Sequence, residues 1–103
     1  MLIDDSLTVR TVFSRMIERE SDMTIVASAS TAERGLDELR RHQVDVILLD
    51  LEMPGMGGIE ALPKLLKTSP RTKVLVISSL TAAGAEHTVQ ALRMGAADTM
   101  LKP

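Results

Sequence analysis

The sequence predicts an α/β domain with a doubly wound, five-stranded parallel sheet, and three observations support this prediction. Short β-rich runs alternate with amphipathic helical segments along the 103 residues. The connections between these segments are short, as expected for parallel strands joined by crossover helices. The run VDVILLD (44–50) is mostly apolar, which is typical of a strand buried on both faces of a sheet. We therefore expect a single domain with helices on both faces.

The first elements are predicted from apolar periodicity. A very short strand, 1–3, precedes a helix that starts near Ser6. The apolar residues of this helix recur at helical spacing: Val9, Val12, Phe13, Met16 and Ile17. Residues 23–29 (MTIVASA) are β-rich and predict the second strand.

The middle of the chain predicts two further helices and the third strand, 44–50. Ser30 and Glu33 have the spacing of a capping box for the second helix. The third helix contains four apolar residues at helical spacing: Ile59, Leu62, Leu65 and Leu66. Pro63 falls within the same segment. Because proline has no N–H to donate, we expect this helix to start late or to kink at Pro63.

The end of the chain predicts a fourth strand at 73–78 (KVLVIS), a helix capped at its C-terminus by Gly95, and a fifth strand at 97–101. No fifth helix follows, so we expect the sheet face covered by the first helix to be half open. Residues 1–103 are therefore expected to be one domain of a longer chain, or to form a homodimer in which a second copy covers this face.

Five such strands suit the flavodoxin-like strand order 2-1-3-4-5, in which ligands bind outside the carboxyl ends of the strands, at the switch point between strands one and three. Polar residues at the strand ends should therefore meet at one edge of the sheet. These residues are Asp4 and Asp5 after strand one, Asp50 after strand three, Ser78 and Ser79 after strand four, and Lys102 after strand five.

This edge has the residues needed for phosphoryl transfer. Three neighbouring carboxylates repel one another, so they require raised pKa values or a bound cation. Mg²⁺ suits oxygen ligands and also takes phosphate oxygens, whereas zinc would call for histidine or thiolate ligands. Asp50 is then the expected nucleophile, with a lysine and a hydroxyl to hold the arriving oxygens. Each residue alone could be a helix cap, a turn residue or a solvated side chain, and only their joint placement favours chemistry.

The composition excludes several classes of function. The net charge of −2, the pI of 5.6 and the absence of a Lys/Arg run argue against nucleic-acid binding by this segment. There is no cysteine, and hence neither a disulfide framework nor a thiol nucleophile. No apolar run approaches the ~20 residues of a membrane span, and no targeting sequence is visible, so a cytoplasmic protein without a membrane partner is expected.

Five motifs distributed over the whole chain resemble one known family. They are IDDS at 3–6, DLEMP at 50–54, the serine pair at 78–79, GA at 95–96 and KP at 102–103. Together they resemble the receiver domain of two-component response regulators. The resemblance implies that a histidine kinase phosphorylates Asp50 and that this switches a downstream output domain.

The resemblance also implies roles for the other residues at the edge. Asp5 and Asp50 would ligate Mg²⁺ directly, Asp4 would reach the ion through water, and Glu52 would contribute its backbone carbonyl. Ser78 would be the switch hydroxyl and Lys102 the partner of the phosphoryl group.

Within this family, the segments SSLT (78–81), GAE (84–86) and GAAD (95–98) are most similar to the receiver of the chemotaxis methylesterase. The output would then be a methylesterase domain; a DNA-binding transcriptional regulator and a stand-alone receiver are the alternatives. Thr99 stands where many family members have Tyr or Phe. We therefore expect activation to depend on Ser78 and the loop after it instead of on an aromatic side chain.

Two other classes of protein fit the sequence less well. A phosphatase-like enzyme with an aspartyl-phosphate intermediate, related to the haloacid dehalogenases, would need a second acid two residues after the nucleophile and a lid. Glu52 is longer than the usual aspartate, and no lid insertion is present. A flavin- or nucleotide-binding protein would place phosphate beside the acids at 4–5, which would repel it, so no organic cofactor is expected.

Overall fold

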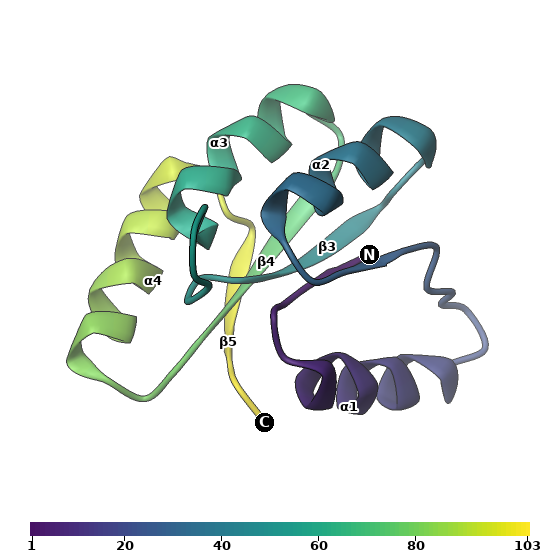
Figure 1. Ribbon diagram of the computed structural model, residues 1–103, viewed down its shortest axis with the longest axis horizontal. Coiled ribbons are helices and arrows are strands. Elements are labelled where there is room, and N and C mark those ends of the chain that lie inside the picture. Colours follow the sequence, from purple (N-terminus) through teal and green to yellow (C-terminus); the bar gives the residue numbers. More distant parts are fainter.

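The computed structural model describes residues 1–103 and contains five strands and four helices (Figure 1). The strands are β1 (Leu2–Ile3), β2 (Ser28–Ala29), β3 (Val46–Asp50), β4 (Lys73–Ser78) and β5 (Asp98–Leu101). The helices are α1 (Leu7–Glu18), α2 (Ala32–Arg41), α3 (Gly58–Thr68) and α4 (Ala82–Met94). The α/β class and the alternation of strands and helices are confirmed.

All five strands belong to one parallel sheet with the order β2-β1-β3-β4-β5, as predicted. Leu2 of β1 pairs with Leu48 of β3, and Asp50 at the end of β3 lies opposite Ile77 of β4. The carboxyl ends of β1, β3 and β4 are therefore neighbours at one edge.

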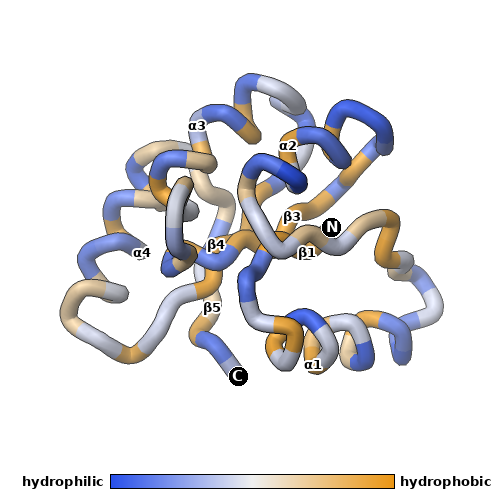
Figure 2. The backbone as a smooth tube through the Cα atoms, in the orientation of Figure 1, coloured by the Kyte–Doolittle hydropathy of each residue, from blue (hydrophilic) through white to orange (hydrophobic).

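The two faces of the sheet are covered unequally (Figure 1). Helices α2, α3 and α4 lie on one face, where a cluster of 17 buried residues forms the main core. Helix α1 lies alone on the other face, where the buried cluster contains only Leu2, Phe13 and Ile77. The hydropathy colouring shows β3 as mostly apolar, as the sequence predicted for a buried strand (Figure 2).

Side chains and glycine define the helix ends. Ser6 caps α1 by accepting a hydrogen bond from the Val9 amide, which confirms the predicted start. Gly95 ends α4 in the left-handed conformation, with φ 117°, as predicted. The capping-box prediction for α2 was wrong: its N-cap is Thr31, which accepts from the Arg34 amide at 3.2 Å. Serine and threonine both cap well, so spacing alone did not identify the capping residue.

Two further predictions need correction. The second strand was expected at 23–29 but is only Ser28–Ala29, because its sole partner, β1, offers just two residues for pairing. The third helix was expected to start late or to kink at Pro63. It begins at Gly58 and contains Pro63, so it does not start late, and the kink stays a prediction. The burial of Leu62 and Leu65 in the main core offsets the backbone hydrogen bond that proline removes.

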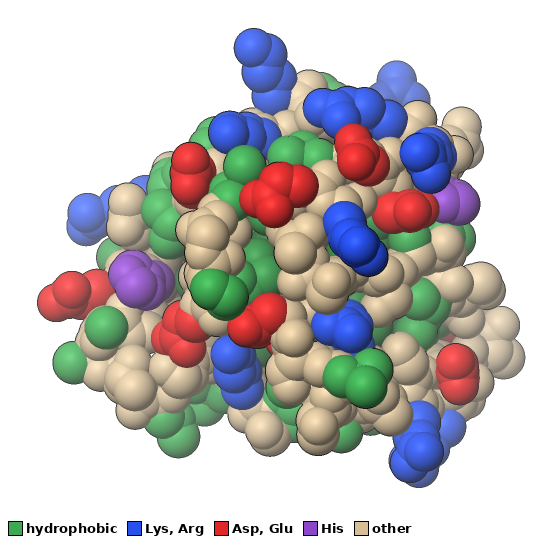
Figure 3. Space-filling view, in the orientation of Figure 1, with side chains coloured by type: hydrophobic (Ala, Val, Ile, Leu, Met, Phe, Trp, Pro, Cys, Tyr) green, Lys and Arg blue, Asp and Glu red, His purple; other side chains and the backbone are tan.

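None of the helices is both long and apolar enough to span a membrane. On the face displayed in Figure 3, acidic and basic side chains are interspersed, without a large basic patch.

Candidate functional site

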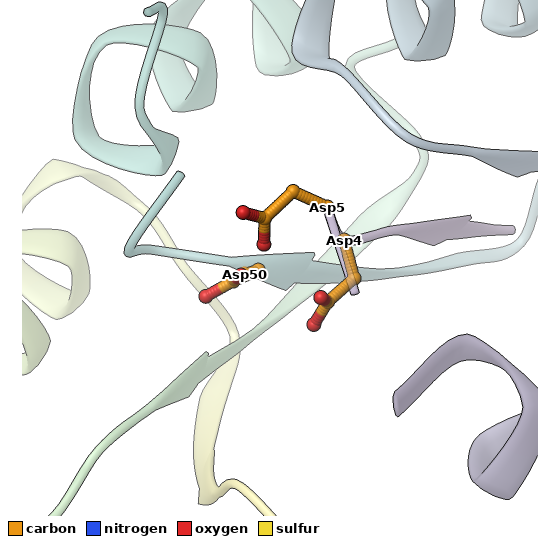
Figure 4. Close-up of side chains that lie close together, drawn as sticks. All are labelled: Asp4, Asp5 and Asp50. Atoms are coloured by element: carbon orange, nitrogen blue, oxygen red, sulfur yellow. The ribbon is translucent and has the colours of Figure 1, made fainter. Parts of the chain in front are cut away.

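The carboxyl ends of β1 and β3 bring three aspartates together (Figure 4). One carboxylate oxygen of each of Asp4, Asp5 and Asp50 lies within 4.8 Å of the others. Asp4 and Asp50 are buried, with exposed fractions of 3% and 0%, whereas Asp5 is exposed. The cluster is therefore open to solvent on the side of Asp5.

Asp50 is held by its own backbone turn and by a lysine from the far edge of the sheet. Its Oδ1 atom accepts a hydrogen bond from the Glu52 amide at 2.9 Å. The Lys102 Nζ atom lies 3.2 Å from Oδ1 and 3.3 Å from Oδ2. Burial raises the pKa of the Asp50 carboxyl to about 6 in spite of these contacts. Near neutral pH the group is therefore mostly a carboxylate, the form that a nucleophile requires.

Asp4 provides an oxygen that lacks a protein partner. Its Oδ1 atom accepts from the Ser6 amide at 2.8 Å, but the Oδ2 atom is buried without a hydrogen bond. Burial also raises the pKa of this carboxyl. A buried carboxylate oxygen without a donor, beside two further carboxylates, fits a hard cation such as Mg²⁺.

Lys102 and Glu52 connect the acidic cluster to the loop after β4. Lys102 Nζ lies 3.9 Å from Glu52 Oε2, and Glu52 Oε1 accepts a hydrogen bond from Ser79 Oγ at 2.6 Å. Partial burial lowers the pKa of the Lys102 ammonium, but the carboxylates of Asp50, Asp4 and Glu52 together raise it more, so the net shift is upward. The family resemblance implied a role only for the backbone carbonyl of Glu52, whereas the structure shows that its side chain also contacts Ser79 and Lys102.

Ser78 lies at the end of β4 but is bonded away from Asp50. Its side chain is 2% exposed, and its Oγ atom is 2.7 Å from Thr88 Oγ1 on α4. The structure thus places Ser78 next to the site without joining it to the carboxylates. Thr88 was not identified from the sequence, because a threonine within an amphipathic helix gives no motif of its own.

A glycine allows α3 to begin directly against the end of β3. A Cβ atom at Gly58 would lie 2.5 Å from the Asp50 carbonyl oxygen and 2.6 Å from the Leu51 Cα atom. Real Cβ contacts are not this short, and both neighbours are backbone atoms. Gly58 therefore fixes the position of the turn that holds Asp50.

A five-stranded parallel sheet with three aspartates at the carboxyl ends of β1 and β3 defines a class of α/β domain. The comparison with known families identifies the same class. The family model for the response regulator receiver domain matches residues 1–103. The chain belongs to this family.

Two relatives show which receiver domains this chain is similar to. The chain is 46% identical over 103 residues to the protein-glutamate methylesterase/protein-glutamine glutaminase 1 of Paramagnetospirillum magneticum, and 48% identical to the corresponding protein 2 of Caulobacter vibrioides. All of this chain is matched, but only 27% and 29% of those proteins. The chain thus spans just over a quarter of the length of these relatives.

A solved structure also shows the likeness to a methylesterase receiver domain. The response regulator domain of Thermotoga maritima CheB superimposes with a TM-score of 0.88 at 39% identity, covering 99% of this chain and 75% of that one. The receiver prediction, the strand order and the likeness to methylesterase receivers are confirmed. Receiver domains bind Mg²⁺ at an acidic pocket, and this chain has a cluster of three aspartates at the corresponding edge of its sheet.

Proposed function

We propose that Asp50 is the phosphoacceptor of this receiver domain. The main observation in favour is that a buried aspartate is held by Lys102 between two further carboxylates, at the edge where parallel sheets bind their ligands. The only ion-pair partner of Asp50 is Lys102, whose side chain is 27% exposed. Three carboxylates beside a single ammonium group are only partly compensated, which costs stability and favours a functional reason for the cluster.

The transfer step follows from this arrangement. An Asp50 carboxylate oxygen forms a bond to the phosphorus of a phosphohistidine on the kinase, while the P–N bond breaks. The imidazole leaves with the electron pair of that bond and takes a proton from solvent. Lys102 then interacts with the new phosphoryl oxygens, and Ser78 donates a hydrogen bond to one of them.

The residues present fit one Mg²⁺ ion. Asp5 and Asp50 would hold it directly, Asp4 through water and Glu52 through its backbone carbonyl. The ion would neutralise the negative charge that the transferred group brings to the acidic cluster. Asp4 also orients the start of α1 through its contact with the Ser6 amide.

The test is phosphorylation by acetyl phosphate with Mg²⁺, followed by intact-mass measurement. We expect one added phosphoryl group in the wild type and none in Asp50→Asn or after chelation of the metal. Asp45→Asn is the matched control, because Asp45 is an exposed aspartate immediately before β3, at the end opposite Asp50. Full labelling of Asp50→Asn would refute the assignment.

We also propose the wider context of this domain. Residues 1–103 would be the receiver part of a longer cytoplasmic chain whose output is a chemotaxis methylesterase domain, with a histidine kinase as phosphodonor. The support is that the relatives described above are methylesterases that continue well beyond the matched region. A homodimer over the α1 face stays a prediction. Reading the gene beyond codon 103 tests the output: a helix-turn-helix domain or a stop codon there would contradict it.

A further inference from the structure

A chain of two side-chain hydroxyls links the end of β4 to α4. Ser78 Oγ lies 2.7 Å from Thr88 Oγ1, and Thr88 Oγ1 donates to the Gly84 carbonyl oxygen at 2.9 Å. The distances alone leave open which hydroxyl is the donor in the first contact, but the second contact decides it.

Each hydroxyl has only one proton to donate. The Gly84 carbonyl oxygen can only accept, so the Thr88 proton lies in that bond. Thr88 Oγ1 must then accept from Ser78, and the single proton of Ser78 points to α4. Because Ser78 is 2% exposed, water offers this hydroxyl little alternative.

A phosphoryl oxygen on Asp50 is likewise only an acceptor. Ser78 can bond to it solely by donating the proton that Thr88 now accepts, so the two acceptors compete for one donor. We propose that Thr88 is a positioning residue that holds Ser78 away from Asp50 in the unphosphorylated protein. This inference rests on the proposed function of Asp50 and deepens it.

The competition also gives a direct link from the site to α4. When Ser78 turns to the phosphoryl group, β4 and α4 lose this side-chain bond. Ser78, Thr88 and Thr99 line a hollow of about 570 Å³ between β4, β5 and α4, which leaves room for the released Thr88 side chain to change rotamer. Thr99 stands where many family members have a bulky aromatic residue, so no large ring fills this hollow.

The test compares the affinity of the protein for beryllium trifluoride, a phosphoryl analogue, in the presence of Mg²⁺. Thr88→Val keeps the shape of the side chain but removes the acceptor. The unbound state then contains an unsatisfied buried Ser78 hydroxyl, and we expect the affinity to rise about fivefold or more. Thr88→Ser keeps a hydroxyl acceptor for Ser78, so it should bind beryllium trifluoride with the wild-type affinity. Binding is measured by isothermal titration calorimetry.

A second serine–threonine–carbonyl chain offers a matched control. Ser69 Oγ lies 2.6 Å from Thr72 Oγ1, which donates to the Val44 carbonyl oxygen at 2.7 Å, just before the amino ends of β3 and β4. Thr72→Val removes the same kind of acceptor far from Asp50. We expect it to lower stability without raising the affinity for the analogue.

Thr88→Val in a Ser78→Ala background completes the design. If Thr88 acts through Ser78, the substitution has no effect on affinity there. An unchanged affinity of Thr88→Val alone, or an equal gain in the Ser78→Ala background, would overturn the inference while leaving the phosphoacceptor assignment intact. A wild type that neither binds the analogue nor accepts a phosphoryl group would overturn both.

Discussion

The two faces of the sheet differ in how completely helices cover them. On the face of α2, α3 and α4, buried side chains form one continuous cluster of 17 residues. On the face of α1, only three residues are buried together. The candidate site lies at the sheet edge between these faces, since Asp4 leads into α1 and the turn after Asp50 leads into α3. A well-packed face thus anchors one side of the site, and a thinly packed face borders the other.

The difference follows from simple dimensions. Five strands about 4.8 Å apart span roughly 19 Å, whereas one helix with its side chains is about 10–12 Å wide. Helix α1 can therefore cover only about half of its face. Its apolar side chains show the result, because Phe13 is buried but Met16 is 49% exposed and Leu7 is 69% exposed.

The largest effect is expected from truncating a side chain on the well-packed face. Leu62 of α3 is fully buried in the main core, so Leu62→Ala should lower the free energy of unfolding by about 2–5 kcal/mol. Met16→Ala on α1 removes a half-exposed side chain and should cost less than about 1 kcal/mol. Urea unfolding measures both variants. Equal losses would show that the α1 face is packed as tightly as the other.

The next largest effect is the pH dependence of stability that Asp50 causes, at the sheet edge between the two faces. Its pKa is raised to about 6 in the folded protein from an ordinary 3.8, so between these values the folded state binds more protons than the unfolded state. Stability should therefore fall as the pH rises through this window, by about 3 kcal/mol at most. Asp50→Asn removes the titrating group. It should be more stable than the wild type near neutral pH by about 1–3 kcal/mol, because the buried charge is removed. The weaker pairing with Lys102 offsets part of this gain.

Urea midpoints of the wild type and Asp50→Asn at about pH 5 and pH 7 measure this effect. Asp22→Asn should retain the wild-type pH dependence, because Asp22 is exposed in the segment between α1 and β2. Mg²⁺ should recover part of the lost stability of the wild type near neutral pH, and much less of it in Asp50→Asn. If the stabilities of the wild type and Asp50→Asn changed alike between pH 5 and pH 7, the result would contradict the raised pKa of about 6.

The architecture was predictable from the sequence because apolar periodicity decides it. The parallel sheet and its order followed from the alternation of strands and helices, and Gly95 marked the end of α4 as expected. The extent of β2 was not predictable in the same way. Residues 23–29 have the composition of a strand, but pairing depends on the length of β1, which is a property of the neighbouring segment. Similarly, tertiary packing of α3 decided that Pro63 lies inside the helix.

The site was predictable where residues follow strand ends, and not where they lie on helices. Asp4, Asp5, Asp50 and Lys102 come together as the strand order requires. Thr88 comes from the middle of α4, ten residues after Ser78, and its contact depends on the rotation and packing of that helix. No spacing rule in the sequence gives this orientation.

The smallest effect concerns the helix caps, one on each face. Ser6 caps α1 and Thr31 caps α2, so replacing either with alanine removes one bond to a helix amide and should cost about 1 kcal/mol in urea unfolding. Ser30→Ala is the control for α2 and should have little effect, because Thr31 is the actual cap.

The two cap variants should differ in where the protein opens. Helix α2 buries Leu36 and Leu39 in the main core, so its amides should exchange with solvent mainly through global unfolding. Helix α1 buries only Phe13, so it can open locally, and Ser6→Ala should speed amide exchange in α1 about fivefold while leaving α3 nearly unchanged. Thr31→Ala should instead change protection in α2 and α3 together, in line with the lower global stability. Hydrogen exchange followed by NMR separates the two patterns. If Ser6→Ala changed α1 and α3 equally, α1 would be part of the same cooperative unit as the main core, in spite of its thin packing.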